Sequence, residues 1–576
     1  MNRKNLMNFF SSSRGQWILL IGFAMIIFLI NLNSEGLFAA QEGKAGVVTR
    51  NMIESGNWLS MEFKGTHTDE KPMFCYWIYA VSAKVFGMNE FALRFPSALS
   101  AIFTVLMTAW LGMKIYGRKT GFLSAYILCT MITFVNLGRV ARIDIILTAF
   151  FMFAMLCLYR GYWEKNKATW WLYLFYITIG LSVLVKGPVG AVLAAFMIFC
   201  YGCIFRKWKI WWELKPISGI IIVLLIGAPW YIYEGIRTGG DFTWTFLVEH
   251  NIKRFVGGSE FKDGKHQPQY FYFGKFFVGA LPWSAAIPFL FLQFWKKRKS
   301  LRPESWFLGI WFVSIFIFFT LGAVKRGDYI LPLYPAAAII IGRYLMILEN
   351  LKFKLYHKWI YGWFTVAGIV LATFGVILSG VLYNIGKKAV YDELPHMNAR
   401  DGHGMMTISN IVNNNLIAFI IAAIIILTLL YMIGKILAEG KFIKALSWYL
   451  PAQLLVMVIY FQFIMVAVDQ VSTNKHFSLR AAEIIPENEK VVYVWFLDPE
   501  IVYYLRRDYE APSAEETNDY VKQYNYLIMQ GKDYRRMDKE KAPFNEFEVA
   551  ATTIKGHASP SVLMVRKGIL NQKSGK

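Results

Sequence analysis

The sequence predicts an all-α protein that crosses a membrane many times and carries a small α/β domain at its C-terminal end. Three observations predict this fold. Of the 576 residues, 56% are hydrophobic and 17% are charged, whereas soluble domains have roughly 25% charged residues. Apolar runs of about 17–25 residues, the length that crosses a hydrocarbon core, recur along most of the chain. After about residue 470 the composition becomes polar and charged.

About thirteen apolar runs are predicted to span the membrane. They lie at residues 16–33, 94–116, 120–138, 144–162, 169–185, 188–205, 216–234, 272–295, 304–322, 328–348, 359–383, 414–434 and 446–468.

The basic residues predict the orientation of these spans. With the N-terminus in the cytoplasm, every predicted inner loop is basic, as in the "KKRK" run at 296–299. The net charge of +23 is dispersed over short loops, which indicates membrane topology and not nucleic-acid binding. We expect a multi-pass protein of the cytoplasmic (inner) membrane whose tail lies outside.

The first apolar run also resembles a signal peptide cleaved near "FAAQ" at 38–41, but a retained anchor is favoured.

The chain divides into a transmembrane domain at 1–468 and an extracytoplasmic α/β domain at 469–576. The first outer loop, residues 34–93, is predicted to contain a helix at 46–58 and an interfacial helix at 72–87, rich in Tyr and Trp. In the tail, strands are expected at 491–496, 524–530, 547–554 and 561–566, and a helix at 499–508. The five cysteines fall in or beside apolar segments and imply no disulfide framework.

Ionisable residues gather at the predicted outer face, where they are costly unless they line a cavity or bind a ligand. Basic residues in two outer segments oppose the topology bias, and an anionic ligand explains them, because Lys and Arg bind phosphate through charge-assisted hydrogen bonds. The outer-face set comprises Glu42, Asp69, Glu70, Lys71, Arg139, Arg142, Asp144, Lys186, Glu249, His250, Lys253, Arg254, Lys325, Arg326, Asp328 and Tyr329.

Several of these residues also have a purely structural interpretation. Asp69 and Glu70 precede Pro72 and are typical of a helix start. Arg139 and Arg142 suit pairing with Asp144 or snorkelling. Lys186 lies in "KGP", which suits a turn, and His396 and His403 suit a solvated loop better than a metal site. Two anionic ligands fit the set, namely a polyprenyl-phosphate lipid and a transported anion.

Several segments resemble membrane glycosyltransferases related to the protein O-mannosyltransferases, above all the bacterial branch that includes the lipid A aminoarabinose transferase. The resemblance covers roughly residues 16–345 in order. It implies a GT-C fold with about thirteen spans and outer juxtamembrane helices, a sugar donor carried on a polyprenyl phosphate, and transfer with inversion. The segments are "TRNMIESGNWL", "DEKPMFCYWIYAVSAKVFGMNEFALRFPSALSAI", "RVARIDIILTAF", "LVKGPVG", "GAPWYIY", "VEHNIKRF", "GALPWSAAIPF" and "DYILPLYPAAAIIIGRYL".

The resemblance also implies roles for individual residues. Glu70 matches a glutamate of the reaction site and Lys71 a lysine that binds the donor phosphate. Arg254 and Tyr329 match phosphate ligands. Asp144 and Lys186 match site-lining positions of the family. Gln41 and His250 are further substrate-binding candidates.

One departure from the family pattern affects the expected chemistry. An Asp-Glu pair of the family falls on Gln41-Glu42, so glutamine replaces the usual catalytic aspartate. Glutamine does not act as a base. Three explanations remain open: Glu42 takes over, Glu70 carries the role, or the acceptor is already ionised and needs no base, as a phosphate is. A fourth is an inactive relative, since fold does not guarantee function.

The sequence therefore predicts a glycosyltransferase that moves a sugar from a polyprenyl-phosphate donor to an acceptor at the outer face of the cytoplasmic membrane. Glu42 and Glu70 are the catalytic candidates, and the acceptor is left open among lipid A-like glycolipid, glycan and protein. No cofactor is identified, and a divalent metal is left open. The rival hypotheses are a transporter or flippase of a lipid-linked anion, and a non-catalytic relative in envelope assembly.

Overall fold

The computed structural model describes residues 12–350 and 421–569. Gaps in these ranges fall at 38, 61, 64–65, 68–70, 165–167, 258–266, 289, 292–300, 422–424, 426–427, 430, 437–438, 440–441, 466–468, 470–472, 514, 538–542 and 554–559. Glu70, the histidines at 396 and 403, and the predicted span at 359–383 lie outside the described residues, as does most of the span at 414–434.

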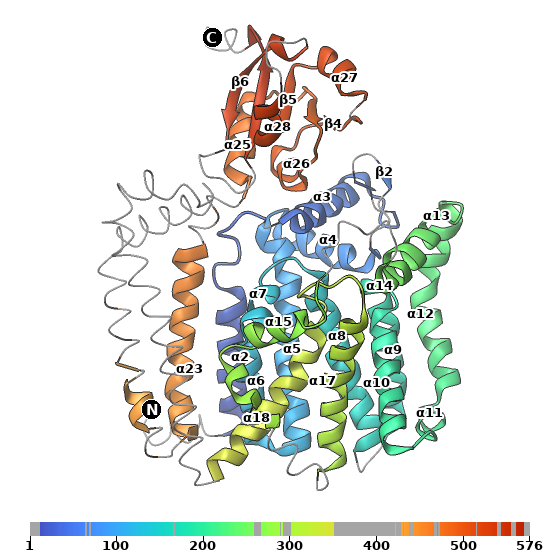
Figure 1. Ribbon diagram of the computed structural model, residues 1–576, viewed down its shortest axis with the longest axis vertical. Coiled ribbons are helices and arrows are strands. Elements are labelled where there is room, and N and C mark those ends of the chain that lie inside the picture. The colour runs from blue at the N-terminus through green and yellow to red at the C-terminus, as the bar shows by residue number, and fades with distance from the viewer. Residues whose placement is uncertain are drawn as a thin grey trace.

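The lower part of the molecule is a bundle of roughly aligned apolar helices (Figure 1). Where the chain is described, these helices fall on the predicted spans. They are α2 (Ser13–Leu29), α5 (Glu90–Tyr116), α6 (Arg118–Cys129), α7 (Ile132–Gly138), α8 (Ile143–Leu158), α9 (Trp170–Lys186), α10 (Val189–Phe205), α12 (Pro216–Arg237), α15 (Phe271–Gly279), α17 (Pro303–Leu321), α18 (Tyr334–Asn350) and α23 (Phe442–Ile459).

Within the described residues, four helical segments are long and apolar enough to span a membrane alone, in α5, α8, α12 and α17. The α6–α7 pair, bent by 68°, makes a fifth if it is one span. The remaining apolar helices are shorter than this criterion requires, so the number of thirteen stays a prediction.

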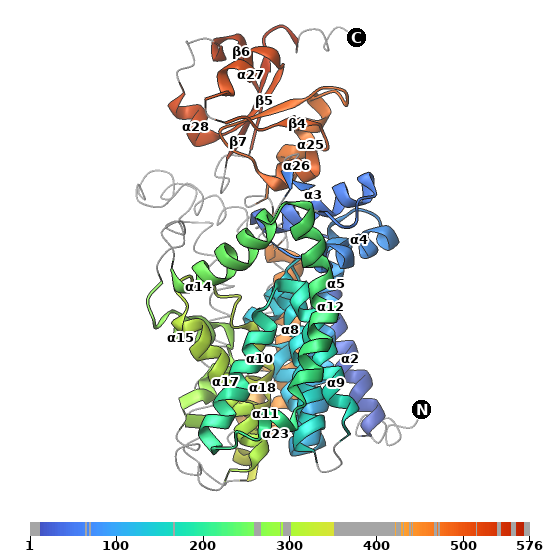
Figure 2. The same cartoon turned by 90° about the vertical axis from the view of Figure 1, so that its right-hand side faces the viewer.

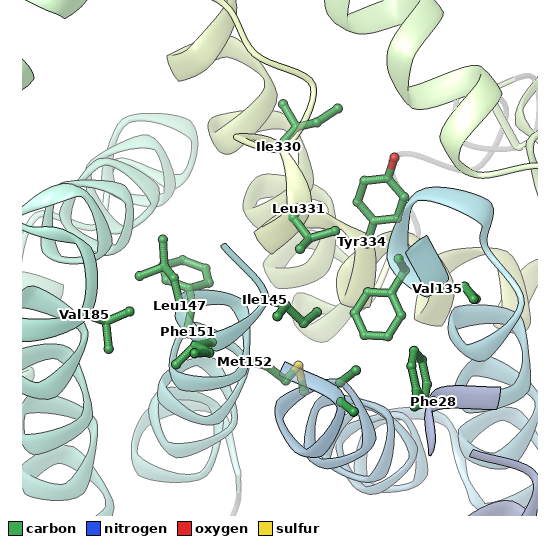
Figure 3. Packing of buried hydrophobic residues seen from close by; sticks show 14 of the residues in the cluster. Phe28, Val135, Ile145, Leu147, Phe151, Met152, Val185, Ile330, Leu331 and Tyr334 are labelled. Atoms are coloured by element: carbon green, nitrogen blue, oxygen red, sulfur yellow. The ribbon is translucent and has the colours of Figure 1, made fainter. Parts of the chain in front are cut away.

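The bundle is held together by large apolar side chains and by small residues at helix crossings. Figure 3 shows part of this core, where Phe28 of α2, Phe151 of α8 and Tyr334 of α18 are buried. Helices α5 and α6 approach closely at Gly112, where an added Cβ would lie 3.0 Å from the Gly121 Cα. Such small-residue contacts are typical of membrane helix pairs, because they let the backbones pack by van der Waals contact.

Above the bundle lie the helices of the first outer loop, α3 (Ala39–Ser55) and α4 (Phe74–Phe86), with a short hairpin of β1 (Glu62–Phe63) and β2 (Thr66–His67) between them. Both predicted loop helices are confirmed. However, α3 begins seven residues before the expected start at residue 46. Gly43 and Gly46 argue against a helix on propensity alone, and burial between two other layers overrides that preference.

The C-terminal region is a five-stranded sheet with order β4-β3-β5-β7-β6. β3 pairs in parallel with β4 and β5, whereas β7 pairs antiparallel with β5 and β6. All four predicted strands and the predicted helix are confirmed, and the two-residue β4 was too short to be predicted. The elements are α25 (Lys475–Ile484), β3 (Val491–Val494), α26 (Pro499–Leu505), β4 (Tyr509–Glu510), α27 (Thr517–Gln523), β5 (Tyr526–Gln530), α28 (Gly531–Arg536), β6 (Phe547–Thr552) and β7 (Ser561–Arg566).

This sheet domain rests on α3 through α26 (Figure 2). A buried acid, Glu500, lies in α26. The Glu500 side chain is 4% exposed and accepts a hydrogen bond from the Asn474 backbone N–H at 2.6 Å. Burial, followed by the neighbouring charge of Asp498 and the more distant ones of Asp469 and Glu42, raises the pKa of Glu500 to about 9. Glu500 is therefore uncharged at neutral pH.

We expect Glu500 to make the protein less stable as pH rises from about 5 towards 9. The unfolded chain releases this proton near pH 4.5 and the folded chain near pH 9, so in this window the folded state binds more protons and the free energy of unfolding falls with pH. Melting temperatures of wild type and Glu500→Gln, measured from pH 5.5 to 8.5, should diverge in favour of the variant. Parallel curves would contradict a protonated Glu500.

Candidate functional site

A cavity of about 630 Å³ opens at the outer end of the bundle, beneath the loop-one helices. Its walls come from the start of α8, the end of α9, the start of α10, the end of α17 and the segment 322–332. A further wall is the π-helix η2 (Trp244–Lys253) with the short α14 (Arg254–Val256) that follows it. Elements far apart in the sequence therefore meet at one end of the molecule, as the predicted topology requires.

Most of the residues predicted for the site line this cavity. Glu42 does not line it, and Glu70 lies outside the described residues. The predicted residues on the wall are Gln41, Lys71, Asp144, Lys186, His250, Arg254 and Tyr329.

Three cations surround the ring of Tyr329. Lys186 Nζ lies 4.7 Å from the ring centroid, and the guanidinium carbons of Arg326 and Arg254 lie 5.9 and 6.0 Å from it. Lys186 forms an ion pair with Asp144, and Arg326 donates two hydrogen bonds to Asp328, at 3.2 and 3.0 Å. Arg254 differs, because its Nε is buried and has no hydrogen-bond partner in the described part of the chain. A buried donor left unpaired is costly, so this geometry favours an anion in the cavity.

The turn that presents Lys186 depends on glycine. Gly187 ends α9 with φ of +86°, which side chains other than glycine rarely adopt. A Cβ at Gly187 would also lie 2.8 Å from the ring of Phe246 in η2. The "KGP" segment is thus a tight turn, and it brings Lys186 against the segment that carries His250 and Arg254.

Arg142 bridges two walls of the cavity. Its Nη1 donates to the Gln41 Oε1 and lies 3.8 Å from Asp328 Oδ2. The expected pairing of Arg142 with Asp144 is not the one that the structure shows. Arg139 is structural, because it donates to the carbonyls of Ile27 and Ile30 at the end of α2, at 2.6 and 2.8 Å.

Glu42 is fully buried in an ion pair on the other side of α3. Its carboxylate accepts from Arg94 Nε at 3.1 Å and Nη2 at 3.0 Å, and from the Ala141 backbone N–H at 2.5 Å. Arg94 also donates to the carbonyls of Leu32, Glu35 and Gly36. These contacts hold the loop to α5, and Glu42 is absent from the cavity wall, so they support a structural role for Glu42, whose predicted catalytic role stays a prediction.

The sequence analysis named Arg326 and Asp328 among the outer charges without giving them a role, and both line the cavity. It did not name Arg94. The sequence feature that Arg94, Arg326 and Asp328 share is a charge in or beside an apolar span. That feature does not distinguish a ligand site from a structural ion pair. Among the described residues, no group of three or more His, Cys, Asp or Glu side chains is placed to hold a metal ion.

The apolar helix bundle and the cavity at its end define the fold of a multi-pass membrane protein. Residues 18–240 match the family model for dolichyl-phosphate-mannose-protein mannosyltransferases. The computed model superposes on the crystal structure of ArnT from Cupriavidus metallidurans bound to undecaprenyl phosphate with a TM-score of 0.78. That superposition covers 96% of this chain and 98% of ArnT at 19% identity, and it shows a shared fold.

Two relatives in other bacteria extend the similarity. An uncharacterized protein of Aquifex aeolicus (strain VF5) is 33% identical over 322 residues, which are 56% of this chain and 62% of the relative. The undecaprenyl phosphate-alpha-4-amino-4-deoxy-L-arabinose arabinosyl transferase of Enterobacter sp. (strain 638) is 28% identical over 66% of this chain and 68% of its own length. The predicted fold class and the resemblance to the aminoarabinose transferase branch are confirmed.

If Glu42 is a structural ion-pair partner, removing Arg94 should destabilise the protein by about 3–5 kcal/mol, because a buried carboxylate loses its partner. Thermal unfolding of Arg94→Ala in detergent measures this. The matched control is Lys114→Ala, which breaks the more exposed Lys114–Glu164 pair of 2.9 Å and should cost about 1 kcal/mol or less. Equal losses in the two variants would contradict a special role for the buried pair.

Proposed function

We propose that this protein is a glycosyltransferase that moves a sugar from a polyprenyl-phosphate donor to an acceptor at the outer face of the cytoplasmic membrane. The observation that carries the proposal is the cation cluster around Tyr329, where the buried Arg254 Nε has no hydrogen-bond partner among the described residues. The similarity to undecaprenyl-phosphate sugar transferases supports it. The N-terminus is proposed to be cytoplasmic and the sheet domain extracytoplasmic.

The charge on the cavity wall suits a phosphate that gains charge during the reaction. Among the described residues, the wall carries four cations, Lys71, Lys186, Arg254 and Arg326, and two carboxylates, Asp144 and Asp328, which leaves a formal excess of +2 from these residues with His250 neutral. When the bond between the anomeric carbon and the phosphate oxygen breaks, the phosphate leaves with the electron pair. Its charge rises from −1 towards −2, so these cations stabilise the transition state more than the bound donor.

The remaining wall is apolar and suits a lipid. Val189 and Val192 of α10 and Phe318 and Phe319 of α17 line the same cavity as the cations. We propose that the prenyl chain lies along these side chains while Lys71, Arg254 and Tyr329 hold the phosphate, with Lys186 and Arg326 behind them. The acceptor oxygen then attacks the anomeric carbon from the face opposite the phosphate, which inverts the configuration.

The acceptor group is proposed to be already ionised, as a phosphate is. Gln41 does not take a proton, Glu42 faces away from the cavity, and the two lining carboxylates are paired with Lys186 and Arg326. An ionised nucleophile requires no base, and the positive wall attracts it. The alternative is a hydroxyl acceptor whose proton goes to Glu70.

The first test separates Arg254 from its neighbour Lys253, which pairs with Glu249 at 3.5 Å and is absent from the cavity wall. Arg254→Ala should weaken binding of undecaprenyl phosphate about ten- to hundred-fold, because a hydrogen bond to a charged group contributes about 1.5–3 kcal/mol. Lys253→Ala should bind within about twofold of wild type, well under 1 kcal/mol. Equal effects would contradict the phosphate site.

A transfer assay with a polyprenyl-phosphate sugar tests catalysis, since a flippase or a scaffold forms no glycosidic bond.

The second test asks whether a base is missing. If the acceptor is ionised, Gln41→Asp should raise the acceptor KM, because it places a negative charge on the wall that attracts the acceptor, and kcat should not increase. If the acceptor is a hydroxyl, the new carboxylate should raise kcat by about 10²–10⁴-fold, the usual contribution of a general base. Steady-state kinetics with a purified glycolipid acceptor decide between the two.

A further inference from the structure

The sheet domain has no part in the proposed chemistry so far, although it contacts a helix that lines the cavity. Helix α26 lies along α3 in both views of the molecule (Figures 1 and 2). From α3, Gln41 reaches the cavity wall, so any displacement of α3 moves a residue of the site.

Two glycines allow α26 to approach α3 closely. A Cβ at Gly43 would lie 2.6 Å from the backbone nitrogen of Glu500 and 2.8 Å from the carbonyl carbon of Pro499. A Cβ at Gly46 would lie 2.6 Å from the ring of Tyr503. Glycine inside a helix costs about 0.5–1 kcal/mol each relative to alanine, so these positions lower the intrinsic stability of α3 and permit a close contact in return.

Polar contacts hold the same interface. Arg50, one turn beyond Gly46, donates to the carbonyls of Tyr503 at 3.1 Å and Val502 at 3.4 Å, at the end of α26. Tyr504 donates to Glu90 Oε1 at 2.9 Å and accepts from the Leu37 backbone N–H at 2.9 Å. The sheet domain is therefore bonded to both ends of the segment that carries α3 and to the start of α5.

Helix α3 is also held from the side of the bundle. Glu42 is bound to Arg94 of α5, and Gln41 accepts a hydrogen bond from Arg142 next to the cavity. Helix α3 thus lies between the bundle and the sheet domain, with its site residue at the edge of both contacts.

We propose that the sheet domain is a clamp on α3 that keeps Gln41 at the cavity wall, which makes Gly43, Gly46 and Arg50 positioning residues for the transfer. This inference rests on the proposed glycosyl transfer. A displaced wall misplaces the acceptor, and a misplacement of about 1 Å can lower a rate about a hundred-fold. Of the three proposed phosphate ligands, Arg254 and Tyr329 come from α14 and the segment 322–332, and only Lys71 lies beside α3, so donor binding should depend on the clamp much less than transfer does.

The experiment inserts a methyl group into the interface. Gly43→Ala should raise hydrogen exchange in α3 and α26 and lower kcat about ten- to hundred-fold, while the Kd for undecaprenyl phosphate stays within about twofold. The matched control is Gly22→Ala, a helical glycine with open space around its Cβ, which should change none of these quantities. Raised exchange in α3 with unchanged kcat would overturn the clamp.

A rescue experiment removes the ambiguity of a variant that folds poorly. Gly46→Ala meets the ring of Tyr503, whose hydroxyl has no hydrogen-bond partner in the described part of the chain. The double variant Gly46→Ala/Tyr503→Ala should recover kcat relative to Gly46→Ala, and an absence of rescue would count against the clamp. If the wild-type protein transfers no sugar while Gly43→Ala still raises hydrogen exchange in α3, the proposed function is wrong. The inference that the sheet domain holds α3 in place is then still supported.

Discussion

The arrangement of the outer face depends on one buried ion pair. Arg94, at the start of α5, uses its guanidinium to bind the Glu42 carboxylate and the carbonyls of Leu32, Glu35 and Gly36. These contacts fix where the chain leaves α2 and where α3 begins. A buried pair of this kind is not strong evidence of stabilisation, because desolvation offsets much of the attraction, but it does specify geometry when every donor is satisfied. Because Glu42 is bound to Arg94, the neighbouring Gln41 is held at the cavity wall.

The cavity presents the opposite electrostatic situation. Here like charges converge on one tyrosine ring, and only some of them have carboxylate partners. A protein gains nothing in stability from placing Lys186, Arg254 and Arg326 so close together, and such strain is usual where a ligand of opposite charge completes the site. The pair at Glu42 therefore holds the first loop to the bundle, whereas the cluster at Tyr329, in the segment between α17 and α18, supports the proposed ligand site.

Much of the fold could be predicted from the sequence, because local composition and the pattern of apolar residues indicate both membrane spans and strands. Runs such as 94–116 and 216–234, and the strand at 561–566, were placed within a few residues. The wall residues Lys186 and Arg254 were also found, since basic residues outside a membrane need a reason. The ion pair of Glu42 could not be predicted, for a different reason. Two adjacent residues on α3 point to different sides, one to the cavity and one to Arg94, and no local pattern reveals which partner is 52 residues away. Gly43 and Gly46 argue against a helix by local propensity for the same reason, because what they allow is a close contact with α26, which is distant in the sequence.

The substitution at position 41 gains a physical meaning from Arg142. In this chain the guanidinium lies between the neutral Gln41 amide and Asp328, which is itself shared with Arg326. With an aspartate at 41, Arg142 would sit between two carboxylates and its charge would be largely neutralised. With glutamine, one carboxylate serves two guanidinium groups, so positive charge remains available at the junction of α3 with the cavity. A cavity wall with glutamine at position 41 lacks a carboxylate that takes a proton, and it carries more positive charge. Such a wall suits a sugar acceptor that is already ionised. The position of the side chain at residue 41 then matters more than its ability to take a proton.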